Sequence, residues 1–200
     1  MIRCEDIGAD PRFTPLANMP AVAVDLRYAS TRNFLGRNLY GDLDCAWLRA
    51  EAAAGLAEAA TWIARHRAGY RLLVLDALRP PRVQEQLWAA VVGTSMQPYI
   101  ARPDRGSIHS FGMAVDVTLL DAAGSECDLG TPFDDLSLGS HPALNAEHLA
   151  LGVLTTAQVT ERGWLSAAMR HAGFVGIHSE WWHFDLGDRD MVRREMPRVL

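Results

Sequence analysis

Lysine is absent from this chain of 200 residues, and all nineteen basic residues are arginine. We attribute this bias to GC-rich coding and infer no function from it. Basic tracts are absent as well, the formal net charge is -5, and the isoelectric point is about 5.8. A chain without a basic stripe lacks the electrostatic footprint of nucleic-acid-binding proteins, so we expect no nucleic-acid partner.

Cysteine is scarce and scattered, since Cys4, Cys45 and Cys127 show no C-x-x-C spacing. An odd number of distant cysteines argues against a disulfide framework and against a cysteine-ligated zinc site. The sequence also lacks an apolar run of about 18 residues, the length that a membrane span requires. No apolar segment with a basic flank indicates a signal peptide. We therefore expect a cytoplasmic protein with no membrane partner.

The hydrophobic content of 49% suits one globular domain with a sizeable core, and we expect a single domain over residues 1–200. It begins with an arm, residues 1–20, whose prolines and lack of periodicity predict irregular structure. Good helix formers predict a helix from Asp44 to His66, capped by Asp42 or Asp44. Further helices are expected over 81–92, 145–151 and 156–171.

Short apolar runs predict strands over 21–26, 70–75, 112–119, 174–177 and 181–186. These strands do not alternate regularly with helices, which favours an α+β fold with a small, mostly antiparallel sheet. Alternation along 112–119 predicts that Val115 and Val117 face the core and that Asp116 faces the other side. Two loops, 93–106 and 121–142, remain, and loops as long as the second are often functional lids.

Two short blocks carry the chemistry. The first, Ser107 to Asp116, reads S-I-H-S-F-G-M-A-V-D, and the second, Glu180 to His183, reads E-W-W-H. Two histidines and one aspartate can fill three corners of a tetrahedral zinc site and leave the fourth for water. Zinc lowers the pKa of such a water toward about 7, and a spare carboxylate can then take its proton. Each block alone is also compatible with chance spacing or core packing.

These blocks resemble the zinc D-alanyl-D-alanine dipeptidases of the VanX type, relatives of the D-Ala-D-Ala carboxypeptidases and of the hedgehog zinc fold. Three other segments resemble the same family: R-Y-A with N-F-x-G from Arg27, D-x-x-R-P from Asp76, and G-T-x-F-D with S-H from Gly130. The five blocks run in the family's order from about residue 25 to 185. A short loop before Ser107 departs from relatives that act in glycopeptide resistance and is expected to shape the substrate entrance.

The resemblance implies one zinc ion per chain, with His109, Asp116 and His183 as its ligands. It implies that Glu180 is the general base, which later hands its proton to the leaving amine. It also implies that Arg79 donates hydrogen bonds to the developing oxyanion. Considered alone, Arg79 is more typical of a surface or structural ion pair, for example with Asp76. Asp76 is expected to orient Arg79 or to hold the loop.

A dipeptidase must recognise the ammonium and the carboxylate of a small free dipeptide. The resemblance makes Asp134 the candidate for the ammonium, with Tyr28 as a helper, and Ser107 a donor to the carboxylate. Loop capping by Asp134 and Ser107, and core packing by Tyr28, are the structural alternatives. His141, in the second loop, is expected to be structural rather than a ligand.

The expected activity is zinc-dependent hydrolysis of D-alanyl-D-alanine, in cell-wall dipeptide turnover or in glycopeptide resistance. Two alternatives are a peptidoglycan D,D-carboxypeptidase or endopeptidase on the same fold, and a zinc-stabilised module without catalysis. Retention of Glu180 and Arg79 beside the ligands argues against the non-catalytic module. The sequence does not specify the oligomeric state.

Overall fold

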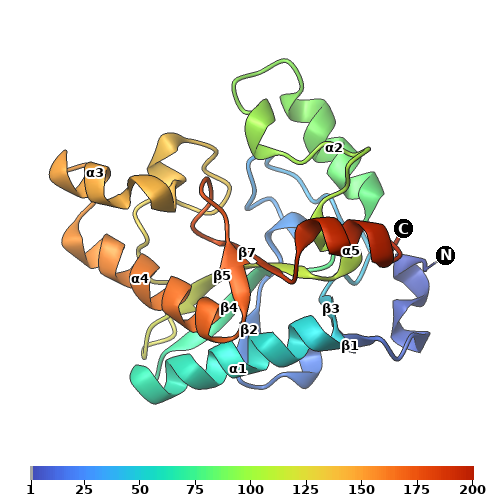
Figure 1. The fold of residues 1–200 in the computed structure, drawn as a ribbon, viewed down its shortest axis with the longest axis horizontal. Helices are drawn as coiled ribbons and strands as arrows, with labels where there is room; N and C mark the ends of the chain where they lie inside the picture. The colour runs from blue at the N-terminus through green and yellow to red at the C-terminus, as the bar shows by residue number, and fades with distance from the viewer. Residues whose placement is uncertain (1) are drawn as a thin grey trace.

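The computed structural model describes residues 2–200. A five-stranded sheet has the order β2-β4-β5-β7-β6, and β1 pairs with β3 in a separate two-stranded sheet (Figure 1). Within the large sheet, β2 and β4 are parallel and the other neighbouring strands are antiparallel. The predicted α+β fold with a small, mostly antiparallel sheet is therefore confirmed. The strands are β1 Phe13–Pro15, β2 Val22–Val24, β3 Trp47–Arg49, β4 Arg71–Asp76, β5 Ala114–Leu120, β6 Phe174–Gly176 and β7 His183–Leu186.

The helices fall between and after these strands. The α-helices are α1 Ala50–His66, α2 Pro81–Val91, α3 Asn145–Ala150, α4 Thr156–His171 and α5 Arg189–Glu195. Short 3-10 helices are η1 Cys4–Ala9, η2 Leu16–Asn18, η3 Arg27–Ala29, η4 Gln97–Tyr99, η5 Ile108–Phe111, η6 Leu138–Ser140 and η7 Pro142–Leu144. No helix among residues 2–200 is both long enough and apolar enough to cross a bilayer.

The main core lies between the large sheet and the helix pair α1 and α4. The two helices contact each other, α1 contacts β4, and α4 contacts β5 and β6. Buried residues of α1 recur at helical spacing, for example Leu56, Ala59 and Ile63, and form the apolar stripe that faces the sheet. A capping box at Thr155 and Gln158 fixes the start of α4. This helix layer therefore packs against β4, β5 and β6.

A second apolar cluster joins the N-terminal segment to α2 and to the end of the chain. It contains Ile2, Ile7 and Phe13 from the first twenty residues, together with Leu87 and Val199. The prediction of an irregular arm over 1–20 is wrong for η1, β1 and η2. Residues of η1 and β1 pack in this cluster, and Leu16 of η2 packs in the main core. Pairing of β1 with the distant β3 has no local sequence signal, because it depends on a partner elsewhere in the chain.

Other predicted boundaries also need correction. The helix expected from Asp44 begins at Ala50, because Trp47–Arg49 forms β3, and the side chain of Asp44 binds the backbone N–H of Ala46 instead of capping a helix. The strand expected over 181–186 begins at His183, and α5 was not predicted. The expectation that one face of β5 is buried is too narrow, since all seven of its residues are buried. The strand lies inside the sheet, between β4 and β7.

Candidate metal centre and active site

Strand pairing brings two of the predicted ligands together. Asp116 on β5 lies directly opposite His183 on the antiparallel β7, and Asp76 at the end of β4 lies opposite Asp116 on the other side. Opposite residues of antiparallel strands hold their Cβ atoms about 4.5–5.5 Å apart, so their side chains meet on one face. The row Asp76, Asp116 and His183 therefore crosses three neighbouring strands.

His109 reaches the same point from η5, the short helix that precedes β5. Gly112 ends this helix with φ +70°, a left-handed conformation in which glycine is favoured, and turns the chain into β5. A Cβ atom at this position would lie 3.0 Å from the Phe13 ring and 3.1 Å from the Arg49 backbone nitrogen. Gly112 therefore bends the chain between His109 and Asp116.

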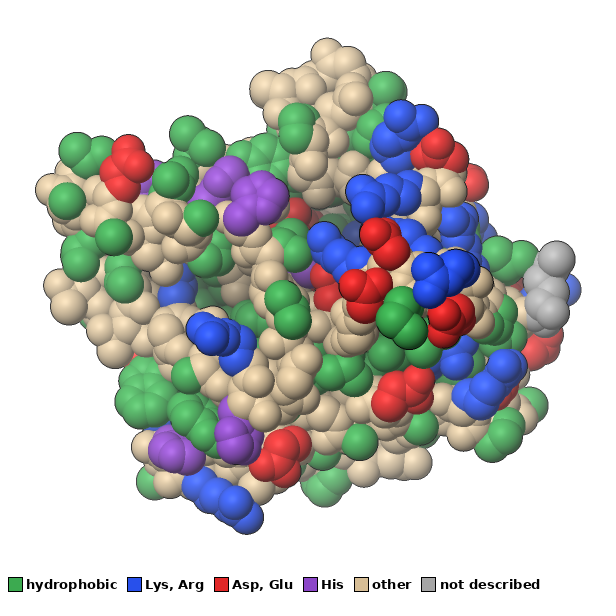
Figure 2. Space-filling model, viewed as in Figure 1, with side chains coloured by type: hydrophobic (Ala, Val, Ile, Leu, Met, Phe, Trp, Pro, Cys, Tyr) green, Lys and Arg blue, Asp and Glu red, His purple; other side chains and the backbone are tan. Residues whose placement is uncertain are grey.

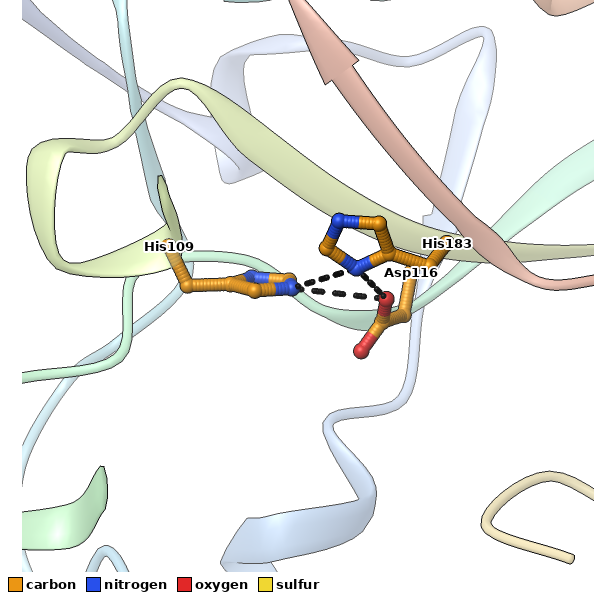
Figure 3. Close-up of side chains that lie close together, drawn as sticks. All are labelled: His109, Asp116 and His183. Atoms are coloured by element: carbon orange, nitrogen blue, oxygen red, sulfur yellow. Dashed lines mark hydrogen bonds and ion pairs between the residues drawn. The ribbon is translucent and has the colours of Figure 1, made fainter. Parts of the chain in front are cut away.

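The three donor groups form a compact set (Figure 3). His109 Nε2 lies 3.2 Å from His183 Nδ1 and 3.4 Å from Asp116 Oδ1, and His183 Nδ1 lies 3.0 Å from Asp116 Oδ1. Donor atoms bound at about 2.0–2.1 Å around a small tetrahedral ion lie roughly 3.3 Å from one another. The donor set therefore fits a metal ion of this kind.

The second nitrogen of each imidazole is fixed by the protein. His109 Nδ1 donates to the carbonyl oxygen of Ala77 at 2.7 Å, and His183 Nε2 donates to Asp185 Oδ1 at 2.9 Å. Asp185 in turn accepts a hydrogen bond from Arg189 Nε at 2.6 Å. Such partners set the tautomer and the orientation of metal-binding imidazoles. Each histidine thus keeps its other nitrogen free to face the centre of the donor set.

The electrostatic surroundings favour a cation at this point. Burial lowers the pKa of His183, but the carboxylates of Asp185 and Asp116 outweigh burial and raise that pKa to about 10. Burial would raise the pKa of Asp116, yet His109 and His183 hold it well below its usual range. A buried carboxylate that stays ionised needs positive charge beside it, which a bound metal ion would also provide.

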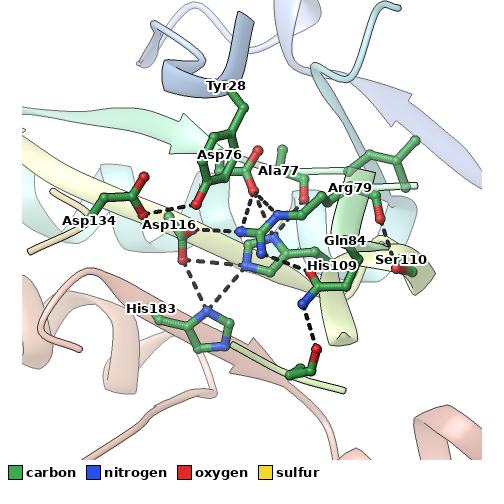
Figure 4. A network of polar contacts seen from close by, with 12 residues as sticks. Tyr28, Asp76, Ala77, Arg79, Gln84, His109, Ser110, Asp116, Asp134 and His183 are labelled. Atoms are coloured by element: carbon green, nitrogen blue, oxygen red, sulfur yellow. Dashed lines mark hydrogen bonds and ion pairs between the residues drawn. The ribbon is translucent and has the colours of Figure 1, made fainter. Parts of the chain in front are cut away.

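Arg79 lies beside this donor set, in a network of buried polar groups (Figure 4). Its Nη2 donates to Asp116 Oδ2 at 3.2 Å, its Nε donates to Asp76 Oδ2 at 2.8 Å, and its Nη1 donates to Gln84 Oε1 at 3.1 Å. The guanidinium also lies over the Tyr28 ring, 4.9 Å from its centroid. Arg79 therefore forms a structural ion pair with Asp76 and also lies at the candidate metal site, so the two alternatives are compatible.

Asp76 holds the Arg79 guanidinium in place through the hydrogen bond from Arg79 Nε. It is completely buried and also accepts a hydrogen bond from the hydroxyl of Tyr40. The backbone after β4 is tied to η5, because Arg79 N–H donates to the carbonyl of His109 and Ser110 Oγ donates to the carbonyl of Arg79. The predicted orienting role of Asp76 agrees with these contacts.

Glu180 lines the same cavity but lies outside the donor set. Within residues 2–200 its carboxylate makes no hydrogen bond or ion pair, whereas the neighbouring Trp181 and Trp182 are packed in the core. Burial raises the pKa of Glu180 to about 8, with His183 acting in the opposite direction. A carboxylate with a raised pKa and no fixed partner can both accept and release a proton near neutral pH.

Asp134, in the loop 121–142, lies against Tyr28 of η3. The Tyr28 hydroxyl donates to Asp134 Oδ1 at 2.9 Å, and the backbone N–H of Phe34 donates to Asp134 Oδ2 at 3.3 Å. Asp134 has φ +64°, an unusual conformation for a residue other than glycine, and this turn aims its carboxylate inward. Burial raises its pKa to about 7, so a cationic ligand would be favoured beside it.

A cavity of about 80 Å³ collects all the predicted site residues. Its lining includes Tyr28, Arg79, Ser107, His109, Asp116, Asp134, Glu180 and His183. Ser107 precedes η5, and its side-chain hydroxyl makes no hydrogen bond among the described residues. Tyr99, Ile100 and Ala101 from the loop 93–106 line the cavity too, in agreement with the predicted location of that loop.

His141 is not part of the donor set. Its Nε2 lies 2.9 Å from the Tyr99 hydroxyl, and its ring packs edge-on against His178. This contact joins the loop 121–142 to the loop 93–106. The structural role expected for His141 agrees with this position.

Sequence reasoning missed several groups that shape the site, namely Gln84, Asp185, Arg189 and Arg193. Asp185 had a usable signal, because residues two apart on a strand share a face and His183-x-Asp185 places a carboxylate beside the ligand. Gln84 had none, since its contact with Arg79 depends on how α2 packs. Arg189 and Arg193 lie on α5, which was not predicted.

Comparison with known proteins agrees with this geometry. The family model described as D-ala-D-ala dipeptidase matches residues 11–199. The chain belongs to this family. Like other members of the D-ala-D-ala dipeptidase family, it therefore falls among the peptidases, which confirms the resemblance carried by the five blocks.

Two curated proteins of similar sequence carry the same description. A D-alanyl-D-alanine dipeptidase of Escherichia coli K12 is 36% identical over 167 residues, which span 84% of this chain and 80% of the relative. A D-alanyl-D-alanine dipeptidase of Synechocystis is 29% identical over 153 residues, 60% of this chain and 61% of the relative. The first match covers most of both proteins and thus includes most of the fold.

Proposed function

We propose that this protein is a zinc-dependent dipeptidase that hydrolyses free D-alanyl-D-alanine to two D-alanines. The observation that carries the proposal is one cavity lined by the His109, Asp116 and His183 donor set, by Arg79 and by Glu180, whose carboxylate has no hydrogen-bond or ion-pair partner among residues 2–200. Membership of the D-ala-D-ala dipeptidase family and the names of both relatives support this substrate.

His109, Asp116 and His183 would hold a single zinc ion. Two imidazole nitrogens and one carboxylate oxygen are a common donor set of catalytic zinc sites, which keep a fourth position open. When bound, zinc supplies Lewis acidity, which activates a water molecule and polarises the scissile carbonyl. Asp185 and the Ala77 carbonyl keep both imidazoles in the required tautomer.

Glu180 takes the proton of the attacking water and delivers it to the nitrogen of the departing D-alanine. Its freedom from other partners leaves the carboxylate available for both steps. Arg79 donates to the oxygen that becomes negative as the carbonyl carbon turns tetrahedral. Asp76 and Gln84 hold the guanidinium in place, so little reorganisation is needed during the reaction.

Asp134 binds the ammonium of the dipeptide, and the Tyr28 hydroxyl orients that carboxylate. Ser107 donates a hydrogen bond to the carboxylate at the other end of the dipeptide. A small dipeptide is thus the partner that we propose, while the absence of nucleic-acid and membrane partners and the cytoplasmic location stay predictions. The same activity would serve cell-wall dipeptide turnover or glycopeptide resistance.

The test is release of D-alanine from D-Ala-D-Ala by zinc-loaded protein, with L-Ala-L-Ala and N-acetyl-D-Ala-D-Ala as comparison substrates. We expect turnover of the free D,D-dipeptide and a loss of at least about 10³-fold in kcat for Glu180→Gln, which should keep its zinc and fold. Glu147→Gln, an exposed change on α3, is the matched control and should behave as the unmodified protein.

The other outcomes separate the alternatives. Efficient turnover of the N-acetyl peptide would indicate a carboxypeptidase, because a blocked amine cannot bind Asp134 as an ammonium. Zinc binding without turnover of any substrate would indicate a non-catalytic module. Loss of zinc from Glu180→Gln would contradict the separation of Glu180 from the metal ligands.

A further inference from the structure

Two arginines of α5 line the cavity next to the candidate metal centre, and sequence analysis assigned neither of them a role. Arg189 and Arg193 are four residues apart, so their side chains lie on the same face of the helix. Figure 2 shows basic and acidic side chains gathered over α5 on the viewed surface of the molecule. The two arginines differ in how their guanidinium groups are used.

The guanidinium of Arg189 is bound to a carboxylate of the protein. Its Nε donates to Asp185, the carboxylate that orients His183. Arg193 instead binds a neutral group, because its Nε donates to the carbonyl oxygen of Gly106 at 3.1 Å. That bond holds the guanidinium beside Ser107, the next residue in the chain, and leaves the terminal nitrogen atoms with donors to spare.

The positive charge of Arg193 is poorly compensated. Its one carboxylate contact among the described residues is Asp190, at 3.3 Å, whose side chain is 77% exposed. Burial, and then the like charges of Arg105 and Arg189, lower the pKa of Arg193. This part of the cavity therefore favours an anion.

The cavity also contains the opposite charge, because Asp134 lines it together with Arg193 but reaches the donor set through different residues. Asp134 and Tyr28 connect to the centre through Arg79 and Asp116, whereas Arg189 connects to it through Asp185 and His183. A free dipeptide has the same polarity, with an ammonium at one end, a carboxylate at the other and the scissile bond between them.

We propose that Arg193 binds the C-terminal carboxylate of the substrate, together with Ser107, and so restricts the enzyme to peptides with a free C-terminus next to the scissile bond. This inference rests on the proposed dipeptidase function. An arginine donor and a carboxylate form a charge-assisted hydrogen bond, stronger than the bond that a neutral amide would accept. Arg193 is then a specificity-determining residue, and Arg189 acts on the metal site through Asp185.

The test compares D-Ala-D-Ala with its C-terminal amide, D-alanyl-D-alaninamide, in the unmodified protein and in Arg193→Gln. We expect Arg193→Gln to raise KM for the free acid about 10- to 100-fold, with a kcat change of less than about threefold. Its KM for the amide should stay nearly constant, so the preference for acid over amide collapses. Arg193→Lys keeps a positive charge and should recover part of the preference.

Arg194→Gln is the matched control, because this neighbouring arginine is exposed and pairs with Glu195. It should leave both KM values unchanged. Metal content and melting temperature of every variant identify a merely structural effect of losing the Gly106 contact. If Arg193→Gln does not fold, the test uses the ratio of the KM values for acid and amide in Arg193→Lys. A ratio equal to that of the unmodified protein overturns the inference.

Calorimetric binding of the two ligands to zinc-loaded Glu180→Gln, with and without Arg193→Gln, provides a readout without turnover. Binding of the acid that weakens tenfold or more in the double variant, with amide binding unchanged, supports the role of Arg193. An acid preference that survives Arg193→Gln overturns it while leaving the dipeptidase function intact. If the unmodified protein turns over neither ligand, the proposed function fails, and the calorimetric data alone then test whether Arg193 binds the carboxylate. If neither ligand binds, the proposed function and the role of Arg193 are both overturned.

Discussion

Asp185→Asn is the substitution that most directly tests how the protein prepares its metal site. Asp185 is 3% exposed and accepts from two donors, His183 Nε2 at 2.9 Å and Arg189 Nε at 2.6 Å. Asparagine has nearly the same shape but offers one acceptor oxygen and one donor NH₂ group. In either amide orientation, one of the two neighbouring N–H groups therefore faces another donor.

The loss should appear as weaker metal binding. Removal of a group that orients a metal-binding histidine typically costs 10- to 100-fold in affinity, which corresponds to about 1.4–2.7 kcal/mol. Competition with a chromogenic chelator would measure the zinc affinity of Asp185→Asn against that of the unmodified protein. Glu195→Gln, an exposed change on α5, is the control for altered charge alone.

A second measurement separates affinity from folding. Melting of the metal-free and zinc-loaded forms should show a smaller increase on zinc binding for Asp185→Asn, because binding energy contributes directly to stability. Zinc affinity equal to that of the unmodified protein would refute the reasoning, since it would mean that the orientation of His183 does not depend on Asp185.

Three further predictions concern other parts of the site. Arg79→Lys keeps the charge but loses the fork of donors, so kcat should fall about 10²- to 10³-fold in steady-state assays, with zinc content unchanged. Burial raises the pKa of Asp134 to about 7, above the ~3.9 of an exposed aspartate. The folded, metal-free protein therefore binds more protons than the unfolded chain between about pH 4 and 7, and the free energy of unfolding decreases as pH rises through this range. Asp134→Asn should remove this part of the pH dependence, measured by urea unfolding at about pH 5 and 8. Gly112→Ala should lower the melting temperature by about 3–6 °C in calorimetry, because a left-handed alanine there meets Phe13 and the backbone of Arg49.

The metal donor set was predicted because its two blocks and three further segments together resemble one family, whereas the spacing within either block is also compatible with chance. What the sequence could not supply was the register that aligns Asp116 with His183 across β5 and β7, which depends on pairing between distant strands. The roles predicted for Glu180, Arg79, Asp134, Tyr28 and Ser107 stay predictions, although all five line the expected cavity.

The misplaced helix start has a physical explanation. Residues 44–49 read as the beginning of a helix because alanine, leucine and arginine follow the capping aspartates. Three of these residues instead pair with Phe13–Pro15, and Arg49 Nε donates to the carbonyl oxygen of Phe111. Tertiary pairing here overrides local helix propensity, which is a weak preference per residue.

The two ends of the described chain lie side by side, and their contact reaches the metal centre. Ile2 and Val199 form a parallel bridge, Leu200 N–H donates to the carbonyl of Ile2, and Val199 N–H donates to the carbonyl of Ser110, the residue after His109. The backbone is therefore close to a closed ring. A circular permutant that joins these ends and opens at the exposed turn 122–125 should build the same centre, whereas clipping residues 198–200 would loosen His109 from a distance.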